Sequence, residues 1–355
     1  MAIISDNEKC INNGIKKNPI IKSESIEYDK SFENSIRPKD FENYIGQSAL
    51  KETLIVSLEA AKLRNKPLDH MLFYGPPGLG KTTISGVIAS QMGVDIKITS
   101  APALERPRDI IGILMSLKDG EILFVDEIHR LNKIAEEILY PAMEDFTIDI
   151  TTGKSQTAKS LRISIPKFTL IGATTKAGDL SSPLRDRFGM IHRLEFYSIN
   201  ELTQVVKRTA NILEIQITEE GAIAIAKRSR GTPRIANRLV KRVADFAIVK
   251  YNGIITDVVA NETLDILKID SFGLDSTDRA LLNLIIEKYD GGPVGVETIA
   301  AALSEDVKTI EDVCEPYLLQ AGFLQRTPRG RKVSPEGYRH LGLNVAPEQK
   351  TLFDN

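Results

Sequence analysis

The sequence predicts an α/β fold in three parts: a three-layer domain with a parallel sheet, a small all-helical domain and a C-terminal winged helix. Short apolar runs alternate with helical stretches up to about residue 197, which is typical of a parallel sheet covered on both faces. No strand pattern occurs between 198 and 270, and the residues that follow contain three helical stretches and a basic, hairpin-like segment. We therefore place the domains at 31–197, 198–270 and 271–344.

The composition is that of a globular protein without a dominant charge. Of 355 residues, 42% are hydrophobic, which suffices for two or three cores. Lys and Arg number 46 against 48 for Asp and Glu, so nucleic-acid binding would require a local basic patch. Cys10 and Cys314 match no metal or redox spacing, which favours a reduced, cytoplasmic setting. The sequence has neither a secretory signal pattern nor a long apolar run, so we expect no membrane association.

The two ends of the chain are expected to lie outside the three domains. Residues 1–30 mix polar residues with scattered isoleucines and have neither helical nor strand periodicity, which predicts a disordered extension. Residues 345–355 are predicted to form a flexible tail.

The segment 75–83, GPPGLGKTT, fits the phosphate-loop pattern G-x-x-x-x-G-K-[ST]. It follows an apolar run at 71–74, expected to be a buried strand, and precedes a helix expected to end near Gly93. A chance match would occur in about one chain of this length in a hundred, and the strand–loop–helix setting makes it rarer. In such a loop, backbone N–H groups surround the phosphates, Lys81 reaches the β and γ oxygens, and the Thr82 hydroxyl is a Mg²⁺ ligand. The chain is therefore expected to bind a nucleoside triphosphate.

A second apolar run, at 122–125, ends in Asp126 and Glu127. A buried parallel strand presents its functional groups at its carboxyl end. We expect Asp126 to hold Mg²⁺ through its water shell and Glu127 to polarise the attacking water. By itself this pair is explained equally well as an acidic loop, but beside a phosphate loop a catalytic role is favoured. His129 has no second ligand nearby in sequence, which favours a structural or network-forming role over metal binding.

A third strand, at 168–171, is followed by Thr174 and Thr175, and either hydroxyl would be placed to contact the γ-phosphate or the water. The residues alone do not determine the roles of two arginines, Arg187 and Arg234. Arg187 follows a strand, where an arginine is usually a solvated charge. Arg234 lies near the start of a helix after Gly and Pro, where phosphate binding and a surface salt bridge are about equally good explanations.

The segment 147–166 is predicted to be a β-hairpin. Its flanks, 146–150 and 161–165, alternate apolar with polar residues, and the residues between them are polar and include Gly153. The alternation produces one apolar face, larger than a solvated hairpin needs, which predicts a docking surface. The alternative is a mobile loop packed on its own domain. The apolar face is expected to contain Ile148, Ile150, Ile163 and Ile165.

The C-terminal third contains the expected basic patch. A helix beginning after Thr218 and extending to Gly231 belongs to the helical domain. The winged helix is expected from helices near 274–289, 296–303 and 306–320, followed by a basic ribbon at 323–333. We expect the ribbon to contact DNA phosphates with little sequence preference. The expected contacts are Arg326, Arg329 and Arg331.

In this order and at these spacings, the motifs resemble the AAA+ ATPases and, more narrowly, the RuvB family of bacterial motors that drive branch migration of Holliday junctions. The resemblance extends from about residue 36 to about residue 343. It rests on the strings at 44–47, 74–83, 126–130, 138–145, 183–189, 230–238 and 323–331. Two departures, the extension 1–30 and the basic residues at 106–108, affect regulation and loop contacts only.

The resemblance implies roles that the residues left open. Thr175, or else Thr174, would be the first nucleotide sensor. Arg187 would be an arginine finger offered to the neighbouring subunit, and Arg234 a second sensor within its own subunit. Ile36, Arg37 and Tyr197 would border the nucleotide base, and 144–146 would lie against it. The nucleotide site would thus contain Ile36, Arg37, Gly78, Gly80, Lys81, Thr82, Thr83, Glu144, Asp145, Phe146, Arg187, Tyr197 and Arg234.

The resemblance also implies a function. The chain would form a homohexameric ring around duplex DNA and use ATP and Mg²⁺ to drive branch migration in homologous recombination, DNA repair and the SOS response. RuvA would dock on the hairpin 147–166, and RuvC would join the junction complex. The alternative is a non-translocating DNA switch, such as a clamp-loader-like or origin-binding ATPase, from which the hairpin distinguishes the motor.

Overall fold

The computed structural model describes residues 35–152 and 159–344. The chain divides into two compact units, 1–37 and 38–355, and the elements below belong to the second. The expected extension at 1–30 and tail at 345–355 lie outside the described residues. Among the described helices, none is long and apolar enough to span a membrane.

The first domain has a five-stranded parallel sheet with the strand order β2-β3-β6-β1-β7. The strands expected near 71–74, 122–125 and 168–171 are present as β1, β3 and β6. The sequence interpretation missed β2 and β7, whose residues are only partly buried or exposed and do not form a continuous apolar run. The strands are β1 Met71–Tyr74, β2 Ile96–Ser100, β3 Ile122–Asp126, β6 Thr169–Thr174 and β7 Met190–Arg193.

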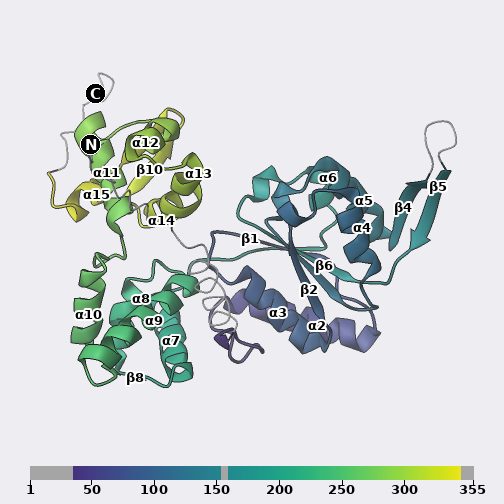
Figure 1. The fold of residues 1–355 in the computed structure, drawn as a ribbon, viewed down its shortest axis with the longest axis horizontal. Coiled ribbons are helices and arrows are strands. Elements are labelled where there is room, and N and C mark those ends of the chain that lie inside the picture. Colours follow the sequence, from purple (N-terminus) through teal and green to yellow (C-terminus); the bar gives the residue numbers. More distant parts are fainter. Residues whose placement is uncertain (1–34, 153–158, 345–355) are drawn as a thin grey trace, which may run out of the picture. The chain divides into compact units, whose positions relative to one another are not determined.

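Helices cover both faces of this sheet, as Figure 1 shows. The side chains of β1 alternate: Met71 and Phe73 pack in the same core as α2 and α3, whereas Leu72 packs in the core that contains α4 and α5. This alternation produces the expected three layers, because a parallel strand buries both of its faces. The helices are α2 Ser48–Arg64, α3 Lys81–Met92, α4 Pro107–Met115, α5 Lys133–Glu144 and α6 Ser182–Arg185, with short 3₁₀ turns at Ala101–Ala103, Ile128–Arg130 and Ala177–Asp179.

The segment after α5 is an antiparallel hairpin of β4 Thr147–Thr152 and β5 Lys159–Ser164, which extends away from the sheet in Figure 1. Opposite residues share a face, so Ile148 lies beside Ile163 on the apolar face. On the other face, Arg162 donates to Asp149 at 2.9 Å. The alternation thus folds as predicted, although the tip, 153–158, lies outside the described residues.

The second domain is helical, apart from one feature that the sequence interpretation missed: two-residue strands β8 Gln216–Ile217 and β9 Ile254–Ile255 pair in parallel. Its helices begin at polar caps. Thr218 accepts a hydrogen bond from the Gly221 N–H at the start of α8, which ends at Lys227, before the predicted Gly231. The helices are α7 Ile199–Ile212, α8 Glu219–Lys227, α9 Pro233–Lys250 and α10 Asp257–Ile266.

The third domain has its own apolar core and the helix–ribbon pattern of a winged helix. The helix expected at 306–320 is interrupted by a π-helical turn, Ile310–Cys314, which separates α13 from α14. The two strands of the ribbon pair with Arg326 directly opposite Arg331. The elements are α11 Ser276–Tyr289, α12 Val296–Leu303, α13 Val307–Thr309, α14 Glu315–Gln320, β10 Leu324–Thr327, β11 Gly330–Val333 and α15 Pro335–His340.

Candidate nucleotide site

The predicted phosphate loop lies at the carboxyl edge of the sheet, between β1 and α3. Its backbone needs glycine: Gly80, the residue before α3, has φ 96°, which residues with a side chain rarely adopt. At Gly78, φ is 82°, and a Cβ atom would lie 3.2 Å from the Cβ of Arg234. The loop thus brings backbone N–H groups to a helix N-terminus, where anions bind.

Lys81 begins α3 and is only 8% exposed. Its ammonium donates to the carbonyl oxygens of Gly75 at 2.7 Å and Pro76 at 2.9 Å. Burial lowers the pKa of Lys81 to about 8, although the nearby carboxylates of Asp126 and Glu127 act in the opposite direction. A phosphate at this loop would compete with two neutral carbonyls for a cation that forms no ion pair with the residues at 35–152 and 159–344.

The strand order brings the second and third motifs to the same edge. β6 lies between β3 and β1, so Thr174, at the end of β6, lies in register beside Tyr74. Glu127 follows β3 in the left-handed backbone region, with φ 49°, which is uncommon for a residue with a side chain and concentrates at functional sites. Its N–H donates to the Asp126 carboxylate at 3.0 Å.

The two threonines have different environments. Thr174 is fully buried, and its hydroxyl accepts the Lys176 N–H at 3.0 Å and contacts His129 Nδ1 at 2.9 Å. Thr175 is partly exposed and donates to Glu127 Oε2 at 3.4 Å. It also lines an open cavity of about 750 Å³ together with Pro76 and Pro77 of the phosphate loop and with winged-helix residues that include Glu311 and Arg326. Of the two hydroxyls, that of Thr175 is therefore the more accessible to a nucleotide.

Arg234 and Tyr197 flank the phosphate loop. The Arg234 N–H, at the start of α9, donates to the Gly78 carbonyl at 3.3 Å. The Tyr197 hydroxyl donates to the Leu79 carbonyl at 3.4 Å, and burial raises the pKa of Tyr197 to about 12. Tyr44, which the predicted site did not include, packs its hydroxyl against Tyr197 and 3.3 Å from the position of a Cβ on Gly80. Its only sequence signal was its place in the string 44–47.

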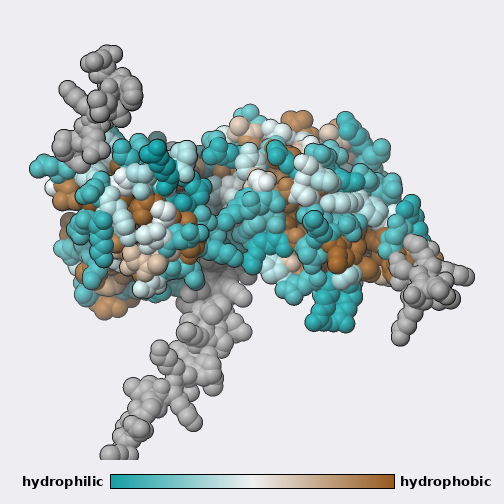
Figure 2. All heavy atoms as spheres, turned by 90° about the horizontal axis from the view of Figure 1, so that it is seen from above, coloured by the Kyte–Doolittle hydropathy of each residue, from teal (hydrophilic) through white to brown (hydrophobic). Residues whose placement is uncertain are grey.

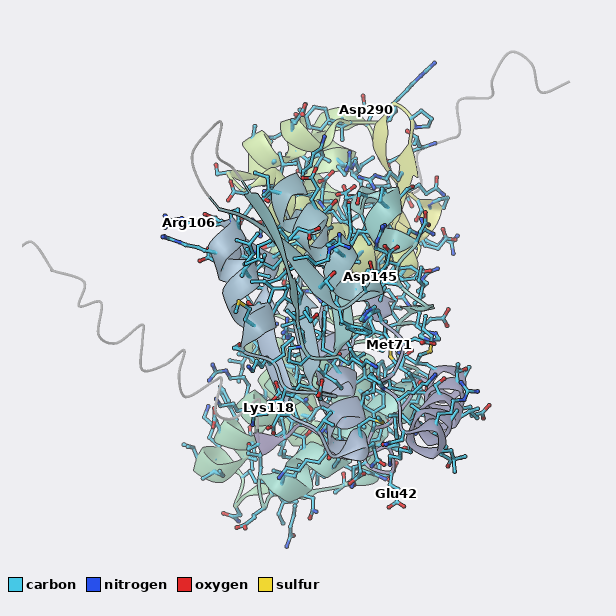
Figure 3. All side chains as sticks on the ribbon, turned by 90° about the vertical axis from the view of Figure 1, so that its right-hand side faces the viewer. Glu42, Met71, Arg106, Lys118, Asp145 and Asp290 are labelled. Carbon is cyan, nitrogen blue, oxygen red and sulfur yellow. The ribbon has the colours of Figure 1, made fainter. Side chains whose placement is uncertain are left out.

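Arg187 and the segment 144–146 lie at the opposite edge of the sheet. Arg187 precedes β7, donates to the Pro183 carbonyl at 2.6 Å and pairs with Glu144 at 3.1 Å. The adjoining Met143 carbonyl is bound by His70, the residue before β1, at 3.0 Å. Glu144, Asp145 and Phe146 are thus at the amino edge of β1, whereas the phosphate loop follows its carboxyl edge, and their place against a nucleotide base stays a prediction. Figure 3 labels Met71, the first residue of β1, and Asp145, the residue that follows α5.

Ile36 and Arg37 belong to the first compact unit, 1–37, so their place beside a nucleotide base stays a prediction. Thr82 and Thr83 occupy the first turn of α3 and are partly exposed. Arg106, one of the departures from the family pattern, precedes α4, and Figure 3 shows its side chain extending away from the domain.

The three arginines of the basic ribbon differ in how accessible they are to DNA. Arg329 is exposed at the turn between β10 and β11. The Arg326 side chain is 57% exposed and pairs with Glu311 at 3.2 Å. The Arg331 side chain is only 10% exposed, contacts Glu311 at 3.2 Å and forms a close ion pair with Glu315. A phosphate contact by Arg331 would therefore require exchange of these carboxylates for DNA.

Comparison with known proteins assigns the whole described architecture. Three family models match in succession: the Holliday junction DNA helicase RuvB P-loop domain at 36–194, the RuvB AAA lid domain at 197–270 and the RuvB C-terminal winged helix domain at 271–342. The chain belongs to the RuvB family. Members of this family are AAA+ ATPases, and because all three matching models are specific to RuvB, the alternative of a clamp-loader-like or origin-binding switch is set aside.

Relatives and solved structures agree with this assignment. The chain is 59% identical to the Holliday junction branch migration complex subunit RuvB of Crocosphaera subtropica over 95% of both chains. It is 61% identical to the corresponding subunit of Rippkaea orientalis over 90% of this chain and 89% of the relative. The solved RuvB Holliday junction branch migration motor of Thermotoga maritima superposes with a TM-score of 0.81 and 50% identity, covering 88% of this chain and 100% of that one.

Proposed function

We propose that this RuvB-family ATPase hydrolyses ATP at the interfaces of a homohexameric ring and thereby moves duplex DNA through Holliday junctions, in the cytoplasm and together with RuvA and RuvC. One observation supports hydrolysis between subunits. The phosphate loop, Glu127 and Thr175 lie at the carboxyl edge of the sheet, whereas Arg187 lies at the amino edge, paired with Glu144. At that edge, Arg187 is better placed to contact the nucleotide of an adjacent subunit than the nucleotide bound by its own phosphate loop.

The chemistry of the side chains fits ATP and Mg²⁺. A hydroxyl from Thr82 and a carboxylate from Asp126 are the hard oxygen ligands that Mg²⁺ prefers, and the ion usually completes its shell with phosphate oxygens and water. In this proposal Lys81 neutralises the phosphates, Glu127 orients the attacking water, Thr175 is the first sensor and Arg234 the second. The pair of Arg187 and Glu144 would contact the nucleotide of the adjacent subunit.

The hairpin 147–166 is proposed to bind RuvA. Ile148 and Ile165 are buried on the domain itself, whereas Leu161, on the same face toward the tip, is 53% exposed. Figure 2 shows hydrophobic surface near the right-hand end of the molecule, where the hairpin lies. The distal part of the face, which Leu161 represents, is therefore a better docking surface than the isoleucines first proposed.

DNA contact is proposed for the ribbon, through Arg326, Arg329 and, after exchange of its carboxylate partners, Arg331. A hydrogen-bonded ribbon of this kind positions guanidinium groups along the phosphate backbone without reading base edges. Affinity is expected to depend on salt much more than on sequence.

Mixed rings test the proposal of hydrolysis between subunits. Arg187→Ala rings and Lys81→Ala rings should each be nearly inactive, because a missing arginine finger costs about 10³- to 10⁵-fold in rate. Mixing the two variants creates some interfaces with an intact loop from one subunit and an intact finger from the other, so ATPase activity should recover in part. Ring formation by each mixture is the control. An absence of recovery in mixtures that form rings would show that Arg187 acts within its own subunit.

A further inference from the structure

His129 lies between Thr174, the neighbour of the proposed sensor Thr175, and the Glu127 carboxylate proposed to orient water. Its Nδ1 atom is 2.9 Å from Thr174 Oγ1 and 3.3 Å from Glu127 Oε2. The imidazole side chain is 11% exposed, and Thr174 is fully buried. One ring nitrogen therefore contacts Glu127, which follows β3, and Thr174, which is the last residue of β6.

The hydrogen-bonding capacity of these groups determines which tautomer fits. The Thr174 hydroxyl already accepts the Lys176 N–H at 3.0 Å, and the Glu127 carboxylate only accepts. A bare Nδ1 would accept from Thr174 but would place its lone pair against the carboxylate. A protonated Nδ1 can donate to either oxygen, so the tautomer with hydrogen on Nδ1 is compatible with both contacts, one at a time.

The surroundings keep the ring neutral. Burial lowers the pKa of His129, even though Glu127 and Asp179 favour the charged form; Lys176 and Arg130 disfavour it. A neutral ring has one N–H to donate, so the hydrogen bond to Thr174 and the hydrogen bond to Glu127 compete for the same proton. A shift of Thr174 would change how firmly Glu127 is held.

We propose that His129 is a positioning residue for ATP hydrolysis, whose Nδ1–H holds the Glu127 carboxylate and links its orientation to the sensor segment Thr174–Thr175. Thr175 donates to the same carboxylate oxygen at 3.4 Å, so both hydroxyls of the segment act on Glu127, one directly and one through the imidazole. If the Thr175 hydroxyl turned to the nucleotide, Glu127 would lose that hydrogen bond and be free to orient water. The orientation of the Glu127 carboxylate would then depend more strongly on His129.

Amide substitutions separate this role from simple packing. In His129→Asn the amide N–H lies near the place of Nδ1, whereas in His129→Gln it lies near that of Nε2. We expect His129→Asn to keep kcat within a few fold of the wild type. His129→Gln and His129→Leu should lower kcat by about 10- to 100-fold, because a displaced catalytic group of this kind costs up to about 10²-fold. KM and the affinity for a fluorescent ATP analogue should change little, since His129 contacts Thr174 and Glu127, whereas the proposed nucleotide contact of this segment is Thr175.

The controls keep the outcome interpretable. His192→Leu removes a half-buried histidine of β7 that contacts neither acid, and it should leave kcat unchanged. In a Glu127→Gln background, His129→Leu should produce no further loss of kcat, because a residue that acts through Glu127 has nothing left to position. Equal losses for Asn and Leu, an unchanged kcat in the Leu variant, or a full additional loss in the Glu127→Gln background would each overturn the proposal.

Discussion

Nucleotide binding should be accompanied by proton uptake at Lys81. The ammonium is buried and held by two neutral carbonyls, and its pKa is lowered from 10.5 to about 8. That lowering corresponds to about 3 kcal/mol against the charged form. A phosphate charge at about 4 Å contributes about 4 kcal/mol at an effective dielectric constant of about 20, so bound nucleotide restores full protonation of Lys81.

The number of protons follows from these values. With a pKa of about 8, Lys81 is partly deprotonated at about pH 8.5, so binding should take up a fraction of a proton per nucleotide. At about pH 6.5 the free lysine is already charged, and uptake by this group should be close to zero. Affinity should consequently weaken as the pH rises above about 8, because proton binding is then coupled to nucleotide binding.

Isothermal titration calorimetry measures this directly. A non-hydrolysable ATP analogue with Mg²⁺ is titrated at about pH 8.5 in two buffers with different ionisation enthalpies, and the difference in observed enthalpy yields the proton number. Lys81→Arg is the matched control, because a guanidinium stays protonated and should take up no proton even if its affinity is lower. The reasoning is refuted if the wild type takes up no proton at this pH, or if the Arg variant takes up as many as the wild type.

Four further predictions concern other parts of the chain. His70 accepts the Leu170 N–H at 2.8 Å, and burial lowers its pKa, so the unfolded state binds more protons in acid. Stability to denaturant should therefore fall as the pH drops below about 6.5, and His70→Asn should reduce this slope. Leu161→Asp should abolish RuvA-stimulated branch migration of a synthetic junction and spare ATPase activity, whereas Arg162→Ala, on the other face of the hairpin, should preserve both. Glu315→Gln should destabilise the winged helix by about 1–3 kcal/mol in thermal or denaturant unfolding, because the buried guanidinium of Arg331 loses one of its two carboxylate partners and keeps only Glu311. Arg329→Ala should leave stability unchanged and flatten the salt dependence of DNA binding by up to about 0.9 log unit.

Each of these predictions has an outcome that contradicts it. An identical acid slope in His70→Asn would place the titration elsewhere. Normal RuvA binding by a folded Leu161→Asp variant would move the docking surface off the hairpin. An unchanged unfolding midpoint in Glu315→Gln would mean that the buried ion pair adds nothing to stability, and an unchanged salt slope in Arg329→Ala would remove that residue from the DNA path.

The sequence alone was sufficient for the chemistry that is local. The phosphate loop, Asp126 and Glu127 are contiguous motifs, so the residue types and their spacing along the chain were enough to recognise them. Alternation in the flanks 146–150 and 161–165 likewise predicted a hairpin, because one buried face requires a period of two. Thr218 indicated the start of α8, since a hydroxyl before an apolar helix satisfies the N–H groups of its first turn.

The tertiary structure decided which of these residues meet. Strand order places β6 between β1 and β3, which brings Thr174 to His129, and no spacing along the chain encodes that order. It also places Arg187 and Glu144 at the edge of the sheet away from the phosphate loop, and it buries Arg331 against Glu315, 16 residues earlier in the chain. Contacts of this kind depend on the packing of distant segments, whose energies sum over the whole core, so a local pattern of residue types cannot determine them.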